Sequence, residues 1–440
     1  MPQTGKGERM KEFHLIIIGS GPAGHTAALT AAKHGLKTAI VEKDMNNLGG
    51  VCLNEGCIPL KGLIHHALAG KKYSDIIKEI KLKIDMLRKG LKSRLESQKI
   101  EIIQGEAAFI SKEEIIVNSE NIKAKNFIIA AGSAANKIFN APCVHSAEKI
   151  FSLDEVPAKA LIIGGGVIGC EYASLLNSLG AEVTIVEILD SILCGEDEEA
   201  IRALEREFKK KKLKVYAKAS VKEVKESGEV VFEQGGKEIT CNFDMIFEST
   251  GRKPHVSGMN LEAAGVELTE DKFIKVNEFM QTSAANIYAA GDCIDTPMLA
   301  YTAAKEAETA VEQIVTGKAP QVDYVSMPRL VFSSPRLGSA GISEKQAKEE
   351  GRETDIYKYF FKAIGKAVVE GKDAGFIKLI AENNRIIGAC AVGHEIADLI
   401  NETAVIIKSG ISVEEIKNTM HIHPSYSEII TEALNYGKVK

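Results

Sequence analysis

Two cysteines, Cys52 and Cys57, lie five positions apart in a segment that also contains Gly56 and Pro59. A redox-active disulfide is one chemistry open to such a pair. In a regular helix their Cα atoms would be roughly 8 to 9 Å apart, whereas a disulfide needs less than about 7 Å. The pair can therefore bond only if the helix is distorted or begins between them, and Gly56 and Pro59 are residues that cause such irregularity. Two free thiols or half of a metal site remain alternatives, although no nearby Cys or His completes a zinc ligand set.

A second candidate group lies near the C-terminus, where His423 precedes Glu428 by five positions. Histidine is suited to proton transfer near pH 7. A carboxylate at its second ring nitrogen would fix the tautomer and stabilise the cation. The stretch Ser425-Tyr-Ser-Glu428 also has the spacing of a capping box. Glu428 is therefore expected to hold His423, to cap a helix, or to do both.

Two glycine-rich segments, 19–24 and 164–169, each follow a short apolar strand and open a helix that leads to another strand. The predicted strand, helix and strand cover 13–18, 23–34 and 37–42 in the first copy, and 160–163, 167–179 and 182–187 in the second. This is the pattern of a dinucleotide-binding unit, in which glycines let backbone amides approach a pyrophosphate at a helix N-terminus. Two copies in the same context predict two dinucleotide sites.

An acidic residue follows the last glycine of each segment by 18 positions (24 to 42 and 169 to 187). Glu42 and Glu187 are thus placed to hydrogen-bond an adenosine ribose. At the second site the carboxylate would repel a 2′-phosphate, and residues 187–194 contain no Arg or Lys. The second site is therefore expected to bind NAD rather than NADP.

The segment Cys52-Leu-Asn-Glu-Gly-Cys-Ile-Pro-Leu-Lys61 resembles the redox segment of the class I flavin disulfide reductases (the pyridine nucleotide-disulfide oxidoreductases), particularly the dihydrolipoamide dehydrogenases. The resemblance runs from about residue 13 to 433 and includes the segments 127–133, 250–254, 286–292, 298–301 and 421–428. The sequence departs from the family pattern at Leu60, Ala131, Tyr301 and Tyr426, and the segment after Lys61 is short. None of these departures removes a redox or proton-transfer group.

The resemblance assigns roles that spacing alone leaves open. It implies a disulfide between Cys52 and Cys57 beside FAD, with His423 and Glu428 as the proton-transfer pair. It also implies that Lys61 and Glu171 meet beside the flavin and the nicotinamide, although each is by itself a common helix-surface residue. The expected FAD-binding residues are Gly19, Gly21, Gly24, Glu42, Lys43, Gly50, Val51, Lys61, Ala107, Ala131, Gly132, Ser133, Asp292, Met298, Leu299, Ala300 and Tyr301. The expected NAD-binding residues are Gly164, Gly166, Val167, Ile168, Gly169, Glu171, Glu187 and Gly251.

The order of predicted elements indicates an α/β fold with two Rossmann-like dinucleotide-binding domains and a C-terminal α+β interface (dimerisation) domain. By the resemblance, residues 1–145 and 272–323 form the FAD-binding domain, 146–271 the NAD-binding domain and 324–440 the interface domain. The other expected helices are 75–98, 197–211, 395–408 and 425–436, with strands near 102, 115 and 127, throughout 214–246, and at 329–332, 377–380 and 386–390.

The resemblance implies an NAD-dependent dihydrolipoyl dehydrogenase that oxidises protein-bound dihydrolipoamide through the cysteine pair and FAD. It also implies a homodimer in which each active site is shared, and a lipoyl-bearing partner from a 2-oxo acid dehydrogenase or glycine cleavage complex. Two alternatives remain: an NAD(P)H-dependent reductase of another low-molecular-weight disulfide, and a flavin-binding subunit without turnover.

Composition excludes several other classes. The net charge of -5, from 55 basic and 60 acidic residues, argues against nucleic acid or an anionic membrane as the main partner. No run approaches 18 apolar residues, so no membrane span is expected. Residues 1–12 are polar and lack the apolar core of a secretory signal. Eight cysteines are too few for a secreted disulfide scaffold of this length, so a reducing cytoplasm is expected. No metal site is expected, and the six cysteines outside the pair are interpreted as small buried hydrophobic residues.

Overall fold

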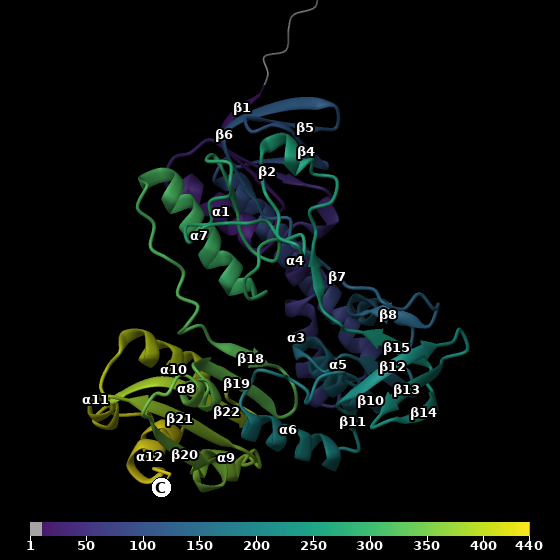
Figure 1. Cartoon of the computed structure of the whole chain (residues 1–440), viewed down its shortest axis with the longest axis vertical. Coiled ribbons are helices and arrows are strands. Elements are labelled where there is room, and N and C mark those ends of the chain that lie inside the picture. Colours follow the sequence, from purple (N-terminus) through teal and green to yellow (C-terminus); the bar gives the residue numbers. More distant parts are fainter. Residues whose placement is uncertain (1–10, 440) are drawn as a thin grey trace, which may run out of the picture. The chain divides into compact units, whose positions relative to one another are not determined.

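The computed structural model describes residues 11–439 and divides the chain into two compact units (Figure 1). The first unit comprises Met1–Gly62, Ile77–Asn136 and Gly251–Val322. The second comprises Leu63–Ile76, Lys137–Thr250 and Asp323–Lys440. The helices α3 (Cys57–Leu68) and α4 (Tyr73–Ser97) each contribute residues to both units.

The first unit is built around the first glycine-rich segment. Its elements are β1 (Glu12–Ile18), α1 (Pro22–Lys33), β2 (Thr38–Glu42), η1 (Met45–Asn47), α2 (Gly50–Asn54), β3 (Glu101–Gln104), β4 (Ala107–Ser111), β5 (Glu114–Val117), β6 (Glu120–Ile129), β7 (Ser133–Ala135), β16 (Arg252–Pro254), η3 (Leu261–Ala264), β17 (Ile287–Ala289) and α7 (Ala300–Thr316).

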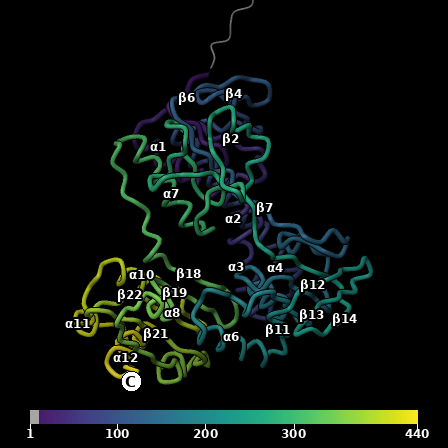
Figure 2. The backbone as a smooth tube through the Cα atoms, in the orientation of Figure 1, coloured from purple at the N-terminus to yellow at the C-terminus, as the bar shows by residue number. Residues whose placement is uncertain are grey.

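A seven-stranded sheet forms the centre of this unit, in the order β3-β2-β1-β6-β5-β4, with β17 also paired to β6. Strands β3, β2, β1, β6 and β17 run parallel, with α1 as the crossover between β1 and β2, and the β4–β5–β6 hairpins are antiparallel. Helices α1 and α7 lie side by side, as the tube in Figure 2 shows. Fully buried alanines, Ala27 and Ala31 on α1 and Ala307 and Ala310 on α7, keep these helices slim enough to pack closely.

The second unit contains the second glycine-rich segment and the C-terminal part of the chain. Its elements are β8 (Val144–Ser146), η2 (Ala147–Ser152), β9 (Lys159–Ile163), α5 (Val167–Ser178), β10 (Glu182–Val186), α6 (Glu198–Lys210), β11 (Lys214–Tyr216), β12 (Ala219–Val224), β13 (Glu229–Gln234), β14 (Lys237–Asn242), β15 (Met245–Glu248), β18 (Arg329–Val331), β19 (Arg336–Gly341), α8 (Glu344–Glu349), β20 (Asp355–Phe360), η4 (Phe361–Ala363), α9 (Gly365–Val369), β21 (Phe376–Glu382), β22 (Arg385–Gly393), α10 (Ala397–Ser409), α11 (Val413–Lys417) and α12 (Glu428–Tyr436).

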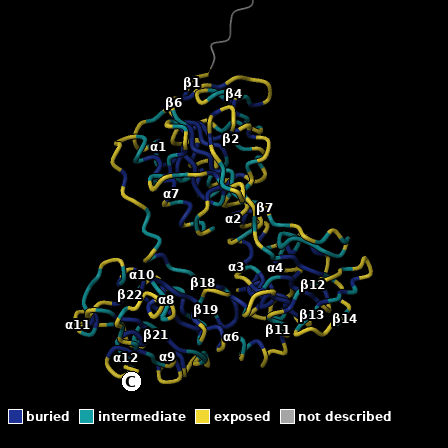
Figure 3. The backbone as a smooth tube through the Cα atoms, in the orientation of Figure 1, coloured by how far each residue is buried: buried dark blue, intermediate teal, exposed yellow. Residues whose placement is uncertain are grey.

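Three sheets make up the second unit. A parallel sheet has the order β11-β10-β9-β15-β8, and an antiparallel sheet has the order β12-β13-β14. The third, β18-β19-β22-β21-β20, is antiparallel throughout, with α10 packed against β19 and β22 and α12 against β20 and β21. Figure 3 shows that the buried residues follow these strands while the connecting loops are exposed. Apolar burial of this extent is the main force that holds each sheet to its helices.

The expected α/β fold with two Rossmann-like units and a C-terminal α+β region is confirmed. The predicted helices and strands agree with the observed ones to within a few residues at their ends. The helix expected to begin at Ser425 begins instead at Glu428, because residues 425–427 form a turn that delivers the Ser425 N–H to the Glu428 carboxylate. Within the described chain, no helix combines the length and the apolar character that crossing a membrane requires.

Candidate active site

The two cysteines of the redox candidate flank a break between two helices. Cys52 lies in α2, which ends at Asn54, and Cys57 is the first residue of α3. A Cβ atom at Gly56 would lie only 2.8 Å from the Val51 carbonyl oxygen and 3.1 Å from the Cys52 Cα, so this turn requires glycine. The structure thus meets the condition that a helix begins between the two cysteines.

Cys52 is half-buried and Cys57 is exposed. The pKa of the Cys52 thiol is raised well above its usual range, first because Cys52 hydrogen-bonds to Cys57 and then because it is buried. A proton is thus held on Cys52. The helix dipole favours negative charge on Cys57, since Cys57 occupies the N-terminal position of α3. The positive charge of Lys61, one helical turn further on, is also felt at the pair.

The C-terminal candidate pair forms as the spacing predicts. His423 Nδ1 lies 2.7 Å from Glu428 Oε1, and 80% of the His423 side chain is exposed. The other carboxylate oxygen, Oε2, accepts the Ser425 N–H at 2.7 Å. The pKa of Glu428 is lowered by these two contacts, the backbone bond more than the histidine bond. Glu428 therefore holds His423 and the turn before α12, but the expected helix cap is wrong. The N-cap of α12 is Ser427 and has no side-chain cap hydrogen bond, and the Ser425 hydroxyl has no partner among residues 11–439.

The first glycine-rich segment, residues 19–24, has a shape that fits a pyrophosphate, and we call it the first cradle; residues 164–169 are the second cradle. A Cβ at Gly19 would meet the Ala130 carbonyl oxygen at 2.3 Å, and one at Gly24 would meet the Gly19 carbonyl oxygen at 1.9 Å. These two glycines are needed for packing between strand and helix. Gly21 is different: it is the N-cap of α1, no side chain caps this helix end, and a Cβ there would project into open space. The uncapped amides and the open space fit a phosphate group.

Glu42 closes the first cradle. Its carboxylate accepts the N–H and the hydroxyl of Ser20 with one oxygen and the Asp44 N–H, at 3.1 Å, with the other. Gly50 approaches the cradle so closely that a Cβ there would lie 2.7 Å from the Gly21 Cα. Lys43 is paired with Glu106 at 2.5 Å on the surface.

The remaining predicted residues of the first site lie at the ends of strands and at the start of α7. Asp292 Oδ2 accepts a 2.7 Å hydrogen bond from the Ser133 hydroxyl, so the two flanking motifs are joined. Gly132 has φ +70° and open space above its Cα. Of the others, Ala107 starts β4, Val51 lies in α2, Ala131 follows β6, and Met298, Leu299, Ala300 and Tyr301 lead into α7.

The second glycine-rich segment repeats the cradle. Gly166 is the uncapped N-cap of α5 and has open space at its Cβ position, whereas a Cβ at Gly169 would meet the Gly164 carbonyl oxygen at 2.0 Å. Glu187 accepts the Gly165 N–H and, at 2.7 Å, the Leu189 N–H. Val167 and Ile168 form the first turn of α5, and Gly251, with φ +106°, follows the end of β15.

Lys61 and Glu171 belong to different units, and their expected pairing stays a prediction. Glu171 lies on α5, is only 2% exposed and accepts the Phe332 N–H at 3.0 Å. Burying a carboxylate is costly unless it is hydrogen-bonded. The hydrogen bond from Phe332 therefore offsets part of the cost of burying Glu171 next to the second cradle.

Comparison with known proteins agrees with this geometry. Residues 13–307 match the model of the family described as pyridine nucleotide-disulphide oxidoreductase, and residues 327–434 match the dimerisation domain of the same family. The chain belongs to the pyridine nucleotide-disulphide oxidoreductases. Among its curated relatives are the dihydrolipoyl dehydrogenases of Bacillus subtilis (strain 168) and Geobacillus stearothermophilus, each 36% identical. These alignments cover 96% of this chain and 96% and 95%, respectively, of the relatives.

Two solved structures have the same fold. The HOCl-induced flavoprotein disulfide reductase RclA from Escherichia coli superposes with a TM-score of 0.89. It is 26% identical, and the match covers 96% of this chain and 99% of that one. LpdA from Mycobacterium tuberculosis, at 23% identity, superposes with a TM-score of 0.88 over 97% of this chain and 99% of that one.

Three further residues of this oxidoreductase support the cradles and were not predicted. The Ser20 hydroxyl accepts the Gly49 N–H at 3.0 Å, which ties the first cradle to the segment before α2. Glu306, fully buried on α7, accepts the Gly291 N–H at 2.7 Å. Arg252 donates to the hydroxyl and the carbonyl of Ser133 at 2.7 and 2.9 Å. Ser20 lies inside the glycine motif and Arg252 inside the segment 250–254, whereas Glu306 gave no signal in the sequence.

The other six cysteines of this oxidoreductase differ in burial, and two of them, Cys143 and Cys241, are half-buried. Cys170, Cys293 and Cys390 are buried, as expected, and burial raises the pKa of each thiol above its usual range. Cys194 is exposed, so its interpretation as a buried hydrophobic residue is wrong; it lies in the turn before α6 rather than in an element of the core. Within residues 11–439, no cluster of three His, Cys, Asp or Glu side chains is placed to hold a metal ion.

Proposed function

We propose that the chain is a dihydrolipoyl dehydrogenase, an FAD- and NAD-dependent enzyme that oxidises protein-bound dihydrolipoamide to lipoamide. The observation that carries this proposal is the arrangement of the cysteines: Cys52 and Cys57 flank a helix break and hydrogen-bond to each other, and this bond raises the pKa of the Cys52 thiol. The curated relatives named dihydrolipoyl dehydrogenase, which match along nearly the whole chain, support the same substrate class.

The cysteine pair would accept two electrons from the substrate by thiol–disulfide exchange. A substrate thiolate attacks Cys52 of the oxidised pair, a mixed disulfide forms, and the Cys52–Cys57 bond breaks with its electron pair on Cys57. The second substrate thiol, once deprotonated, attacks the mixed disulfide and releases lipoamide and Cys52. The raised pKa of Cys52 and the helix N-terminus at Cys57 suit this division of roles, since the leaving sulfur is the one that best carries negative charge.

His423 would take the protons of the substrate thiols. Its Nδ1 is held by Glu428, so the exposed Nε2 is the nitrogen available to a substrate. The carboxylate stabilises the imidazolium that each proton transfer creates.

The two cradles would hold the two cofactors. The first, next in sequence to the cysteine pair, would bind FAD through Gly19, Gly21, Gly24 and Glu42, and the second would bind NAD through Gly164, Gly166, Gly169 and Glu187. Bound FAD would carry the electron pair from the reduced cysteines to NAD, giving NADH and restoring the disulfide. Lys61 and Glu171 would meet beside the flavin and the nicotinamide.

The proposal includes the domain limits and the assembly. Residues 1–145 and 272–323 would form the FAD-binding domain, 146–271 the NAD-binding domain and 324–440 the interface domain. The match of 327–434 to a dimerisation domain supports a homodimer, in which His423 of one protomer would serve the cysteine pair of the other. The lipoyl group would be presented by a 2-oxo acid dehydrogenase or glycine cleavage complex in the cytoplasm, where cysteines outside the active site stay reduced.

A substrate panel tests the proposal. The flavin-loaded enzyme is assayed with dihydrolipoamide and NAD, and in the reverse direction with NADH and lipoamide, glutathione disulfide or coenzyme A disulfide. We expect kcat/KM for lipoamide to exceed that for the other disulfides by at least ~100-fold, since catalysis depends on differential transition-state binding.

One alternative function has specific support. The likeness to a flavoprotein disulfide reductase at 26% identity favours a reductase of another low-molecular-weight disulfide. Preferred turnover of such a disulfide would replace the proposed substrate. An absence of turnover with every thiol and disulfide in a flavin-loaded protein would favour a non-catalytic flavin-binding subunit.

A further inference from the structure

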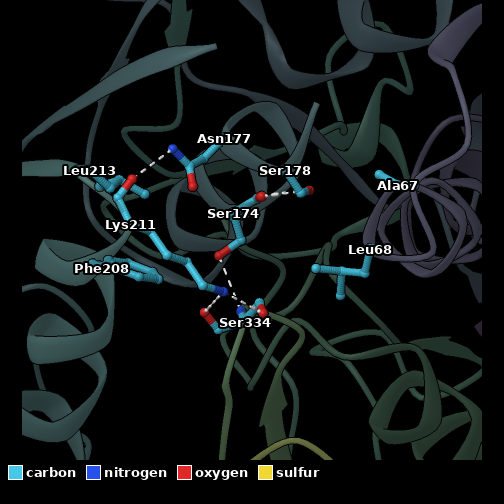
Figure 4. Close-up of a pocket in the computed structure, with 10 residues that line it drawn as sticks. Ala67, Leu68, Ser174, Asn177, Ser178, Phe208, Lys211, Leu213 and Ser334 are labelled. Atoms are coloured by element: carbon cyan, nitrogen blue, oxygen red, sulfur yellow. Dashed lines mark hydrogen bonds between the residues drawn. The ribbon is translucent and has the colours of Figure 1, made fainter. Parts of the chain in front are cut away.

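A pocket in the second unit shares no residue with either cradle or with the pair His423 and Glu428. It has a volume of about 340 Å³ and is lined by the ends of three helices and by Ser334 (Figure 4). The wall from α3 includes Ala67 and Leu68, which belong to the short segment after Lys61 that departs from the family pattern. A pocket of this size accommodates a small organic molecule.

One side of the pocket carries hydrogen-bond donors without acceptors. The Lys211 ammonium donates to the carbonyl and the hydroxyl oxygen of Ser334 at 2.8 and 2.7 Å. A lysine has three N–H donors, so one remains open, and among residues 11–439 no carboxylate forms an ion pair with Lys211. Desolvation lowers the pKa of Lys211 despite the nearby charge of Glu207, which is itself paired with Lys210.

Two buried hydroxyls next to Lys211 add further open donors. Ser174 is 6% exposed and Ser334 is 5% exposed. The Ser174 hydroxyl accepts the Ser334 N–H at 3.2 Å, and the Ser334 hydroxyl accepts from Lys211. Neither hydroxyl donates to an acceptor in the part of the chain that the structure describes. Figure 4 shows these groups gathered on one side of the pocket. Two buried O–H groups and one N–H of the ammonium of Lys211, an exposed residue, thus lie together without an acceptor among the described residues. For the two hydroxyls, a buried donor left unpaired is destabilising.

The rest of the lining is mixed, since Asn177 and Ser178 are polar. Phe208 and Leu213 are almost completely buried, so the apolar surface open to a ligand is that of Leu68, which is 50% exposed and stands across the pocket from them. A bare phosphate or sulfate would satisfy the donors but leave this apolar wall at Leu68 uncovered. An uncharged apolar molecule would cover the wall but leave the ammonium without a counter-charge.

We propose that this pocket is a binding site for a small carboxylic acid whose carboxylate is held by Lys211, Ser174 and Ser334 and whose apolar body packs on Leu68. The site does not depend on the proposed function, because none of these residues belongs to the cysteine pair, the proton-transfer pair or either cradle.

The test is calorimetric titration of the flavin-loaded enzyme with phenylacetate, with the uncharged isostere phenylacetamide and with inorganic phosphate. Phenylacetate is expected to bind once per chain with a Kd on the order of 1 mM, as befits a ligand of this size. Phenylacetamide and phosphate are each expected to bind at least ~10-fold more weakly, since one lacks the charge and the other the apolar body.

Variants place the binding in this pocket. Lys211→Met should weaken phenylacetate binding at least ~10-fold, while Lys209→Met, a change on the same helix end outside the pocket, should leave it unchanged. Leu68→Glu, at a half-exposed position that tolerates substitution, should abolish binding by placing a second carboxylate in the site. Equal melting temperatures of the variants exclude a folding effect.

Three results would overturn the proposal. They are no saturable binding of phenylacetate up to ~50 mM, binding that Lys211→Met leaves intact, and phosphate or phenylacetamide binding as tightly as phenylacetate.

Discussion

One carboxylate oxygen of Glu428 lies 2.7 Å from His423 Nδ1 and forms a hydrogen bond with it. The other oxygen accepts the backbone N–H of Ser425, which is two residues after His423. One carboxylate thus fixes both the imidazole and the turn that carries it. The histidine is thereby aimed with Nε2 outward, although most of its surface is in contact with solvent.

Glu428→Gln should separate these two effects. The amide can still accept the Ser425 N–H, but it no longer stabilises a protonated His423. We expect kcat/KM for dihydrolipoamide oxidation to fall by about 10²-fold, with little change in the melting temperature. Glu414→Gln, at an exposed helix position, serves as the control and should have wild-type activity. Unchanged dithiol oxidation in Glu428→Gln would remove this carboxylate from the mechanism.

Two glycine substitutions in the first cradle should have different effects, one on cofactor binding and the other on folding. Gly21→Ala adds a methyl group in open space, so the apoprotein should fold normally while its affinity for FAD falls at least ~10-fold. Gly24→Ala places a Cβ 1.9 Å from a carbonyl oxygen, so it should destabilise the fold itself by about 2 kcal/mol or more. Flavin absorbance after gel filtration and thermal unfolding of the apoproteins measure the two effects. Full FAD retention by Gly21→Ala would mean that no phosphate sits at this amide.

Glu187 should decide between the two nicotinamide cofactors. Its carboxylate lies at the end of β10, held by the N–H groups of Gly165 and Leu189, where a ribose 2′-phosphate would meet its charge. The wild-type enzyme should prefer NADH over NADPH by at least ~100-fold in kcat/KM, and Glu187→Ser should narrow this ratio by at least ~10-fold. Glu182→Ser, at the exposed start of the same strand, should leave the ratio unchanged. Equal use of both cofactors by the wild type would refute the assignment.

A buried ion cluster predicts how the second unit responds to acid. Lys378 is only 3% exposed and contacts Asp197, Glu199 and Glu344 at 2.8 to 2.9 Å. Burial acts to raise the pKa of Glu199, but hydrogen bonds from Lys378 and Lys358 outweigh it and lower the pKa to about 2. A lowered folded-state pKa stabilises the fold above the ordinary value near 4.5, and this stabilisation is lost as the pH falls from there toward 2.

Lys378→Met should therefore be most damaging at neutral pH. Removing the cation leaves three carboxylates together, which should cost about 3 kcal/mol at pH near 7. Protonation of the carboxylates relieves this repulsion, so the difference from wild type should shrink as the pH approaches about 4. Thermal midpoints measured across this range test the sign, with the exposed Lys345→Met as control. A deficit that grows on acidification would contradict the account.

The sequence predicted those parts of the site whose signal is local. The glycine-rich segments and the acidic residues after them were identified because strand, turn, helix and strand follow each other within about 30 residues, as the unit requires. The need for a helix break between Cys52 and Cys57 followed from helix geometry alone. Glu428 was correctly predicted to hold His423, but the predicted capping box does not form and the helix start was placed three residues too early, because the same spacing serves a capping box and a turn.

The parts that sequence reasoning missed depend on residues far apart in the chain. The bond from the Gly291 N–H to Glu306 joins a strand end to a buried face of α7. Lys378 meets Asp197 across 181 positions, and its one local signal is a lysine in the middle of an apolar strand. The pocket at Lys211 combines α3, α5 and α6 with Ser334, so no single segment shows it.

The central claim is that electrons from a dithiol reach NAD only through the Cys52–Cys57 pair, and one variant tests it most directly. Cys57→Ser should abolish NAD reduction by dihydrolipoamide and yet retain electron transfer from NADH to an artificial acceptor, because the cradles are untouched. Cys194→Ser, which changes an exposed cysteine outside the site, should retain both reactions. Dihydrolipoamide oxidation at a wild-type rate by Cys57→Ser would contradict the account.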